Sequence, residues 1–559
     1  MEPSNISPIK RFWLLINPDK KEIRNIYIYA IFIGLVNLSL PIGIQAIINL
    51  IQGGQMSVSW MVLVAFVIIG IAISGILQIN QFRITEYLQQ KIFTRAAFEF
   101  TYRIPKIKLE ALYKHYAPEL MNRFFDVITI QKGLSKILID FSTASIQTVF
   151  GLILLSLYHP FFIVFSLILI LLIYSIFRLS AKKGLETSLQ ESKSKYNVAH
   201  WLEEVARTSV TFKLAGQTDL HMNRSNDLID HYVTARDSHF KVLISQYGFM
   251  ILFKVLVAAG FLIVGSILVM EQQMNIGQFV AAEIIILLVL SSVEKLITNL
   301  DTIYDVLTSL EKVGQVTDLA IERHSGMDIK DVSSENGGLS VELKDVVFHY
   351  PEQERLIFNK ASLLIKEGEK IMVIGDSETG KTTLLYLLSG IYRVISGAVV
   401  FNNIPLHNLN PILLRSTIGD CLMDELLFEG TLLENVTMGR EKASFENVQW
   451  AFDKLGLNSF LKSLPQGYDT MIQSQGKQFS KGIVDKLIIA RSIVDKPKLL
   501  LIKDAFTSLA GEDRKKIMNF LTSKENAWTL VIASGDKELK KKVDRLILSE
   551  NGSLIEIKK

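Results

Sequence analysis

Six apolar segments in the N-terminal part of the chain set the strongest limit on how it can fold. They cover residues 26–48, 60–79, 137–158, 160–178, 247–270 and 276–297. Each approaches the roughly 20 apolar residues that a helix needs to cross a bilayer, where backbone polar groups find no water. The mean hydropathy of the whole chain is positive, and 49% of its residues are apolar. Both values are typical of a membrane protein, and we predict six transmembrane helices.

Basic residues orient these helices. They cluster before the first segment and after the second, at Lys10, Arg11, Lys20, Lys21, Arg24, Lys91, Arg95, Arg103, Lys106 and Lys108. The short turns after the first, third and fifth segments contain no lysine or arginine. Because basic loops stay on the cytosolic side, we predict outward-facing short turns and two cytosolic termini. We expect a multi-pass protein of a cell membrane, the bacterial inner membrane, with no cleaved signal peptide and no peptidase domain before the first helix.

Two long connections, residues 80–136 and 179–246, follow the second and fourth segments. Both are charged, contain few glycines or prolines, and repeat leucine and isoleucine with helical spacing. We predict that the helices continue through them into the cytosol. The far ends are expected to bend near residues 112–122 and 214–222.

Polar residues inside the apolar segments are candidates for function. Lys254 lies in the fifth segment and Glu283 in the sixth, where an ionisable group is costly, so each is a candidate for a substrate or proton path. The alternative is that both side chains reach the membrane surface or face water inside the bundle. Asn37, Gln45 and Asn49 are expected either to line a cavity or to bond to neighbouring helices.

The hydrophobic period changes from residue 339 onward. The short apolar runs LSVELKDVVF, KIMVIG, GAVVF, KLLLIK and TLVIAS predict strands, and they alternate with helical runs. This alternation predicts an α/β domain around a largely parallel sheet. A polar stretch, HSGMDIKDVSSENGG, precedes it as a linker. We therefore divide the chain into a transmembrane domain, a linker and a C-terminal domain, at residues 1–310, 311–338 and 339–559.

The eight residues GDSETGKT lie between a predicted strand and a predicted helix. This is the arrangement of a phosphate-binding P-loop, in which the loop amides surround the phosphates. Lys381 is expected to reach the terminal phosphates of ATP, and the Thr382 hydroxyl is expected to bind Mg²⁺. The nucleotide-binding candidates in this region are Gly375, Asp376, Ser377, Glu378, Thr379, Gly380, Lys381, Thr382 and Thr383.

Several further stretches follow the order of one family. Tyr350 lies in VVFHYP before the P-loop; LLFEGTLLENV, LPQGYDT and FSKGIVDKLIIARSIVDKPKLLLIKDAFTSL follow it. With the six spans, this ordered set resembles an ATP-binding cassette (ABC) exporter half-transporter over nearly the whole chain, and it is far more specific than a P-loop alone. The resemblance implies an α-helical six-span domain followed by an α/β P-loop domain with a helical subdomain. It also implies that Tyr350 stacks on adenine.

The chain departs from the family at the positions that cleave ATP. The family's magnesium-binding glutamine falls at Met423, whose thioether is a poor ligand for a hard cation. Counted without gaps, the metal-binding aspartate falls at Lys503 and the general-base glutamate at Asp504, the one catalytic candidate. If the register slips by one, Asp504 becomes the metal aspartate and Ala505 replaces the base. Either way, two acids are required and one is present.

Two further departures concern the γ-phosphate and the dimer. The family's γ-phosphate histidine falls at Gly535, and its dimer-loop aspartate falls at Ala510. In the signature FSKGI, Ser480 and Gly482 match residues that touch a partner's ATP in the family, whereas Lys481 replaces a glycine. Loss of a general base alone costs about 10²–10⁴-fold in rate. We therefore expect ATP binding with a weakened Mg²⁺ site and little hydrolysis at this P-loop.

These features lead to three hypotheses. The first is a half-subunit of an ABC exporter that binds ATP and pairs, as a dimer, with a catalytically complete half-transporter. The second is a nucleotide-sensing regulatory or gating subunit that does not transport, and the third is a slow, unorthodox homodimeric ATPase. A net charge of +4 is too small to indicate a nucleic-acid partner, and the single cysteine excludes an intramolecular disulfide.

Overall fold

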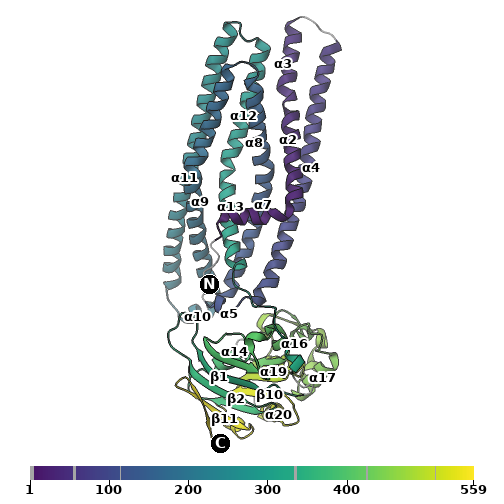
Figure 1. Cartoon of the computed structure of the whole chain (residues 1–559), viewed down its shortest axis with the longest axis vertical. Coiled ribbons are helices and arrows are strands. Elements are labelled where there is room, and N and C mark those ends of the chain that lie inside the picture. The colour runs from purple at the N-terminus through teal and green to yellow at the C-terminus, as the bar shows by residue number, and fades with distance from the viewer. Residues whose placement is uncertain are drawn as a thin grey trace. The chain divides into compact units, whose positions relative to one another are not determined.

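The chain divides into two compact units. The computed structural model describes residues 6–53, 58–113, 115–332, 337–422, 426–509 and 511–558. The first unit, here the helical unit, comprises Met1–Pro105 and His115–Leu319. The second, here the sheet unit, comprises Lys106–Lys114 and Ala320–Lys559. Figure 1 shows the helices of the one and the strands of the other. The domain boundaries at residues 310 and 339 stay predictions.

The helical unit consists of helices joined by short turns. They are α1 (Pro8–Ile16), α2 (Lys20–Asn37), α3 (Ser39–Gln52), α4 (Val58–Arg103), α6 (Ala117–Met121), α7 (Asp126–Lys136), α8 (Ser142–Ser156), α9 (Phe161–Arg207), α10 (Ser209–Leu214), α11 (Leu220–Met270), α12 (Ile276–Thr298) and α13 (Leu300–Thr317). A π-helical turn, Ile137–Phe141, connects α7 to α8. No pattern in the sequence predicted this turn.

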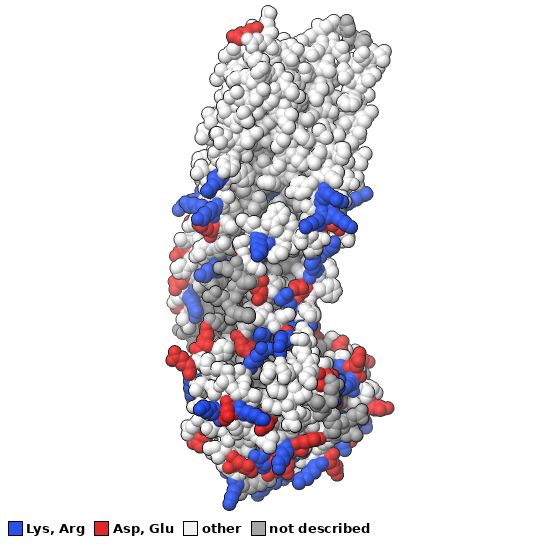
Figure 2. Space-filling model, viewed as in Figure 1, with Lys and Arg blue, Asp and Glu red and all other residues white. Residues whose placement is uncertain are grey.

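Six helical stretches of the described chain are long and apolar enough to cross a membrane. They are Pro8–Gln52, Val58–Lys106, Ala117–Ser156, Phe161–Arg207, Leu220–Met270 and Ile276–Thr317. Each overlaps one of the six predicted segments over most of its length, so the prediction of six spans is confirmed. Figure 2 shows that one end of the helical unit is almost free of charged residues and that a belt of lysine and arginine marks where this apolar part ends.

The first predicted span is two helices rather than one. Helix α2 ends at Asn37 and α3 begins at Ser39, with Leu38 between them. Pro41 explains the break, because its nitrogen has no hydrogen to donate to the carbonyl one turn earlier. The side-chain oxygen of Asn37, at the end of α2, accepts a hydrogen bond from Ser74 Oγ of α4 at 2.8 Å. Of the alternatives for Asn37, bonding to a neighbouring helix is confirmed.

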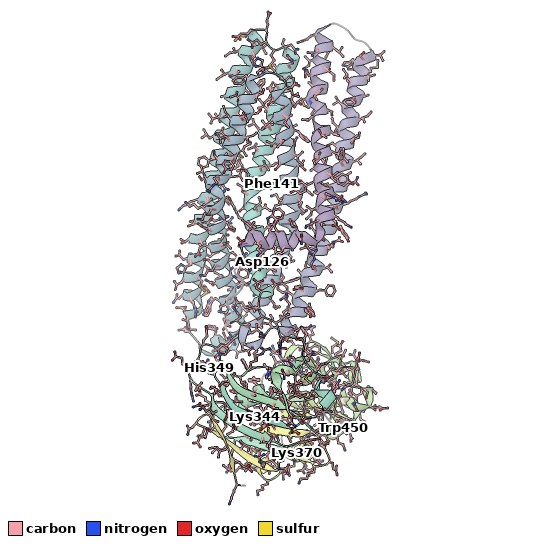
Figure 3. All side chains as sticks on the ribbon, in the orientation of Figure 1. Asp126, Phe141, Lys344, His349, Lys370 and Trp450 are labelled. Atoms are coloured by element: carbon pink, nitrogen blue, oxygen red, sulfur yellow. The ribbon has the colours of Figure 1, made fainter. Side chains whose placement is uncertain are left out.

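The long connections are helical, as predicted. Helices α4, α9 and α11 contain 46, 47 and 51 residues and run far beyond the apolar segments. The chain turns between α5 (Leu109–Leu112) and α6, and again between α10 and α11. Both turns fall within the predicted bends. A buried polar cluster stabilises this charged part, where the Tyr196 hydroxyl donates to Asp126 and the Arg123 guanidinium lies 3.6 Å from the Tyr196 ring centroid (Figure 3).

The polar residues within the apolar segments bond between helices. The Lys254 ammonium on α11 lies 2.7 Å from Glu294 Oε2 on α12. The Tyr158 hydroxyl donates to Gln45 Oε1 at 2.7 Å. Glu283, by contrast, has no side-chain hydrogen bond or ion pair within the described ranges. Lys254 therefore has a structural partner that the spacing of the segments did not reveal, whereas the role of Glu283 stays a prediction.

The sheet unit alternates strands and helices. Its strands are β1 (Val341–Phe348), β2 (Phe358–Ile365), β3 (Lys370–Ile374), β4 (Ser396–Phe401), β5 (Ile404–Pro405), β6 (Ile418–Cys421), β7 (Gly430–Thr431), β8 (Met471–Ile472), β9 (Leu499–Lys503), β10 (Thr529–Ala533), β11 (Arg545–Glu550) and β12 (Ser553–Ile557). Besides α5, its helices are α14 (Lys381–Leu388), α15 (Pro411–Arg415), α16 (Leu432–Thr437), α17 (Phe445–Lys454), α18 (Asn458–Ser463), α19 (Lys481–Ile493), α20 (Gly511–Thr522) and α21 (Lys537–Lys540).

The strands form two main sheets. The six-stranded sheet has the order β12-β11-β3-β10-β9-β6 and is parallel except at its β12 edge, as the alternating pattern predicted. Strands β1 and β4, predicted from the same pattern, belong instead to a separate antiparallel sheet of order β2-β1-β4-β5. Helices α16, α17 and α18 lie between β6 and β9 in the chain, which agrees with the expected helical subdomain.

The central strands are apolar on both faces because both faces are covered. Met372, Leu500 and Ile532 pack into one core together with residues of α16, α17, α19 and α20. Their chain neighbours Val373 and Leu501 pack into a second core with the antiparallel sheet and α14. This packing fixes the carboxyl ends of β3, β9 and β10 at one edge of the sheet.

Candidate functional site

The P-loop joins β3 to α14 through two glycines with left-handed backbone. Gly375 has a φ of 149°, and a Cβ there would lie 2.5 Å from Ser549 O and 2.7 Å from Thr379 Oγ1. Gly380 caps α14 with a φ of 94°. Side chains would clash or strain at both positions, so glycine is required. The loop is held by Thr379 Oγ1, which donates to Asp376 O at 3.0 Å.

Lys381, the first residue of α14, folds back over the loop. Its ammonium donates to Gly375 O and to Asp376 O, each at 2.5 Å. The amides of the following helical turn have no partners within the helix, and the helix dipole favours an anion beside them. The loop thus presents a cation and free backbone donors at one place, which is the chemistry that polyphosphate requires.

A cavity of about 460 Å³ opens beside this loop. It is lined by Tyr113, Tyr350, Gln353, Arg355, Ile357, Glu378, Gly380, Lys381, Thr382 and Thr383. The Tyr350 hydroxyl and Thr383 Oγ1 form a 2.9 Å hydrogen bond, which fixes the ring beside α14. Burial raises the pKa of Tyr350, so its hydroxyl stays neutral. The structure therefore brings Tyr350 together with five of the predicted P-loop residues, Glu378, Gly380, Lys381, Thr382 and Thr383, whereas Gly375, Asp376, Ser377 and Thr379 do not line the cavity.

Four residues of the cavity wall were missed by sequence reasoning, namely Tyr113, Gln353, Arg355 and Ile357. None belongs to a motif, and Tyr113 comes from the segment Lys106–Lys114, far from the others in the sequence. Arg355 forms an ion pair with Glu378 at 3.3 Å, with both side chains largely exposed. No local pattern could have indicated these positions.

The two positions implied for acids lie at the same edge of the sheet. Lys503 is the last residue of β9 and pairs with Ala533 of β10, which in turn pairs with Val373 of β3. Asp504 follows Lys503, and its amide donates to Ala533 O at 3.1 Å. The sheet thus places Lys503, followed by Asp504, at the same edge as the end of β3, which leads into the P-loop, with β10 between the two strands.

Of the remaining positions that the resemblance implies, some lie within the described residues and others do not. Gly535 lies two residues after the end of β10, and a Cβ added there would meet no heavy atom within 4 Å. Met423 and Ala510 lie outside the described residues. The signature residues Ser480 and Gly482 do not line the cavity.

Ser480 is the N-cap of α19, but its side chain makes no capping hydrogen bond. The next residue, Lys481, extends along the helix to Asp485, with 2.8 Å between its ammonium and Asp485 Oδ1. A Cβ at Gly482 would lie 3.3 Å from Ser508 O. The exposed Ser480 hydroxyl and the first amides of α19 therefore remain available to an anion from outside the chain.

Comparison with known proteins gives consistent matches. Residues 23–293 match the ABC transporter transmembrane region, and residues 358–507 match the ABC transporter family. The alpha-hemolysin translocation ATP-binding protein of Escherichia coli O157:H7 is 28% identical over 292 residues, 52% of this chain and 41% of that protein. The exotoxin translocation ATP-binding protein of Pasteurella aerogenes is 28% identical over 363 residues, 64% of this chain and 50% of that protein. Each match spans at most half the length of the relative.

One solved structure shares the fold of nearly the whole chain. A bacterial Atm1-family ABC exporter with ATP bound superimposes with a TM-score of 0.83 at 18% sequence identity. The match covers 96% of this chain and 95% of that one.

Proposed function

Because this chain belongs to the ABC transporter family, we propose that it is the half-subunit of an exporter whose cassette binds ATP without cleaving it efficiently. The observation that carries the proposal is the contrast within one site. The P-loop has its lysine, its threonines and its left-handed glycines, whereas the end of β9 has Lys503 and the single acid Asp504 where the resemblance, in either register, implies two carboxylates.

The side chains present fit Mg²⁺ poorly. Thr382 offers one hydroxyl oxygen, and an ammonium cannot ligate a cation, so Lys503 removes a ligand and repels the metal. Asp504 is the only acidic residue in the described range from Lys503 to Leu509, and it cannot act both as metal ligand and as base. Phosphoryl transfer depends on metal, an oriented water and charge stabilisation. We therefore place hydrolysis at this P-loop close to zero, while the Lys503 ammonium supplies part of the charge that a metal would bring.

A dimer with a catalytically complete half-transporter keeps one competent ATP site. In that arrangement, the partner's P-loop and general base face Ser480 and Gly482 of this chain. The exposed, uncapped Ser480 hydroxyl supports this pairing, as does the ion pair that holds the Lys481 ammonium near Asp485. ATP bound at the P-loop of this chain then stabilises the closed dimer without being cleaved. The long cytosolic helices couple closure to alternating access in a cell membrane, with both termini in the cytosol.

Reconstitution with and without a partner tests this function. The tagged chain is purified from its native membranes, any co-purifying half-transporter is identified by mass spectrometry, and each is reconstituted alone and together. We expect Mg²⁺-dependent ATP turnover in the mixture and almost none with this chain alone. Brisk turnover by this chain alone would favour a homodimeric ATPase. A nucleotide-dependent change of shape, with no substrate movement in the mixture, would favour a gating subunit.

A further inference from the structure

Two nearly parallel aromatic rings line the cavity beside the P-loop. The rings of Tyr113 and Tyr350 have centroids 6.0 Å apart and planes inclined by 16°. Gln353 Nε2 donates a hydrogen bond to the Tyr113 hydroxyl at 2.7 Å, which orients the Tyr113 ring. Both rings line the same cavity as Lys381 and Thr382. Tyr350 is also held by edge-to-face contacts with Phe348 and Tyr392, each with centroids 5.3 Å apart.

Hydrogen bonds at several points attach the segment Lys106–Lys114, which carries Tyr113, to the rest of the sheet unit. Near its start, Lys108 N donates to Ala320 O at 2.9 Å and Glu322 N donates to Lys106 O at 2.7 Å. Further along, the Arg393 amide donates to Glu110 Oε1 at 3.1 Å. Tyr113 is thus positioned by several contacts and is not a free surface side chain, although 39% of it is exposed.

We propose that Tyr113 is the second wall of the base-binding pocket, so that the base of the bound nucleotide stacks between Tyr113 and Tyr350. The proposal deepens the ATP site of the proposed function and rests on it. The P-loop binds the phosphates and does not distinguish one base from another, whereas two aromatic faces bind the planar ring of the base. Stacking on an aromatic side chain contributes about 1–3 kcal/mol per base, equivalent to roughly 5- to 150-fold in affinity.

Binding of the base also moves Tyr113. Each stacked contact requires about 3.5 Å between planes, so a base between the two rings separates them to about 7 Å. The centroids are 6.0 Å apart in the present structure, so the base pushes the rings apart.

The test compares ligands with and without a base. Binding of ATP, ADP and inorganic tripolyphosphate to the full-length chain in detergent is measured for the unaltered protein and for Tyr113→Ala and Tyr113→Phe. We expect Tyr113→Ala to weaken ATP and ADP binding about 5- to 150-fold and to leave tripolyphosphate binding unchanged, which also shows that the site has folded. Tyr113→Phe keeps the ring and stays within about 3-fold of the unaltered chain. Tyr116→Ala is the matched control, since Tyr116 is 40% exposed and does not line the cavity.

A labelling experiment on the unaltered chain supports or opposes the same conclusion without a substitution. Photolysis with 8-azido-ATP, which reacts from the base, should label the peptide that contains Tyr113. Unchanged or tighter ATP binding by Tyr113→Ala with normal tripolyphosphate binding would overturn the second wall and leave the ATP site intact, as would labelling confined to other peptides. An unaltered chain that binds neither ATP nor tripolyphosphate would overturn the proposed function itself, and the wall with it.

Discussion

Replacement of Lys381 by alanine is expected to abolish ATP binding at micromolar nucleotide, with an affinity at least about 100-fold lower. Without nucleotide, the ammonium bonds to Gly375 O and Asp376 O; with a triphosphate bound, it turns to the terminal phosphates. Each charge-assisted hydrogen bond contributes about 1.5–3 kcal/mol, and the alanine variant loses those that the ammonium would make to the phosphates. Isothermal titration calorimetry on the full-length chain in detergent measures the change.

Lys516→Ala is the matched control for this substitution. Lys516 lies on α20, its side chain is 71% exposed, and its neighbour is Glu512 on the same helix. The variant loses the same charge far from the P-loop and should bind ATP with unchanged affinity. Equal affinities for Lys381→Ala and Lys516→Ala would mean that the nucleotide does not bind at the P-loop.

Asp504→Asn is expected to change the turnover of the reconstituted pair by less than about 2-fold, whereas Glu→Gln at the partner's general base lowers it by about 10²–10⁴-fold. Neither chain neighbour of Asp504 is acidic, since Lys503 precedes it at the end of β9 and Ala505 follows it. The substitution is mild for the backbone: Asp504 has a φ of 44°, a left-handed conformation that asparagine also adopts. Steady-state phosphate release in proteoliposomes measures both variants.

The opposite ranking would reassign the chemistry. If Asp504→Asn reduced turnover by 10²-fold while nucleotide affinity held, Asp504 would be a working base. The chain would then be an active half of the pair, and the ammonium of Lys503 would need another explanation.

The helical unit could be predicted closely because its pattern is local. Apolar length identifies a membrane helix, so all six spans were found, and the helical repeat of leucine and isoleucine extended them correctly. The break at Leu38 was missed because the apolar run is continuous there, although Pro41 marks it. The Lys254–Glu294 ion pair was missed for another reason: it joins two different helices, and segment spacing does not fix their rotation.

In the sheet unit, strand positions were predictable but strand partners were not. The runs that became β1 and β4 have the same apolar character as β3, yet they form a separate antiparallel sheet. Pairing depends on contacts between residues far apart in the chain, which a single sequence does not encode locally. Tyr113 illustrates the same limit, because nothing around it in the sequence relates it to the P-loop cavity that it lines.

The most direct test of the central claim follows the fate of ATP bound to the purified chain. The chain is loaded with radiolabelled ATP and Mg²⁺, incubated at working temperature, and the bound nucleotide is separated and quantified over time, with Lys381→Ala as the blank. We predict that the bound nucleotide remains ATP. Its rapid conversion to ADP, dependent on Mg²⁺ and absent from the blank, would contradict a cassette that holds ATP without cleaving it.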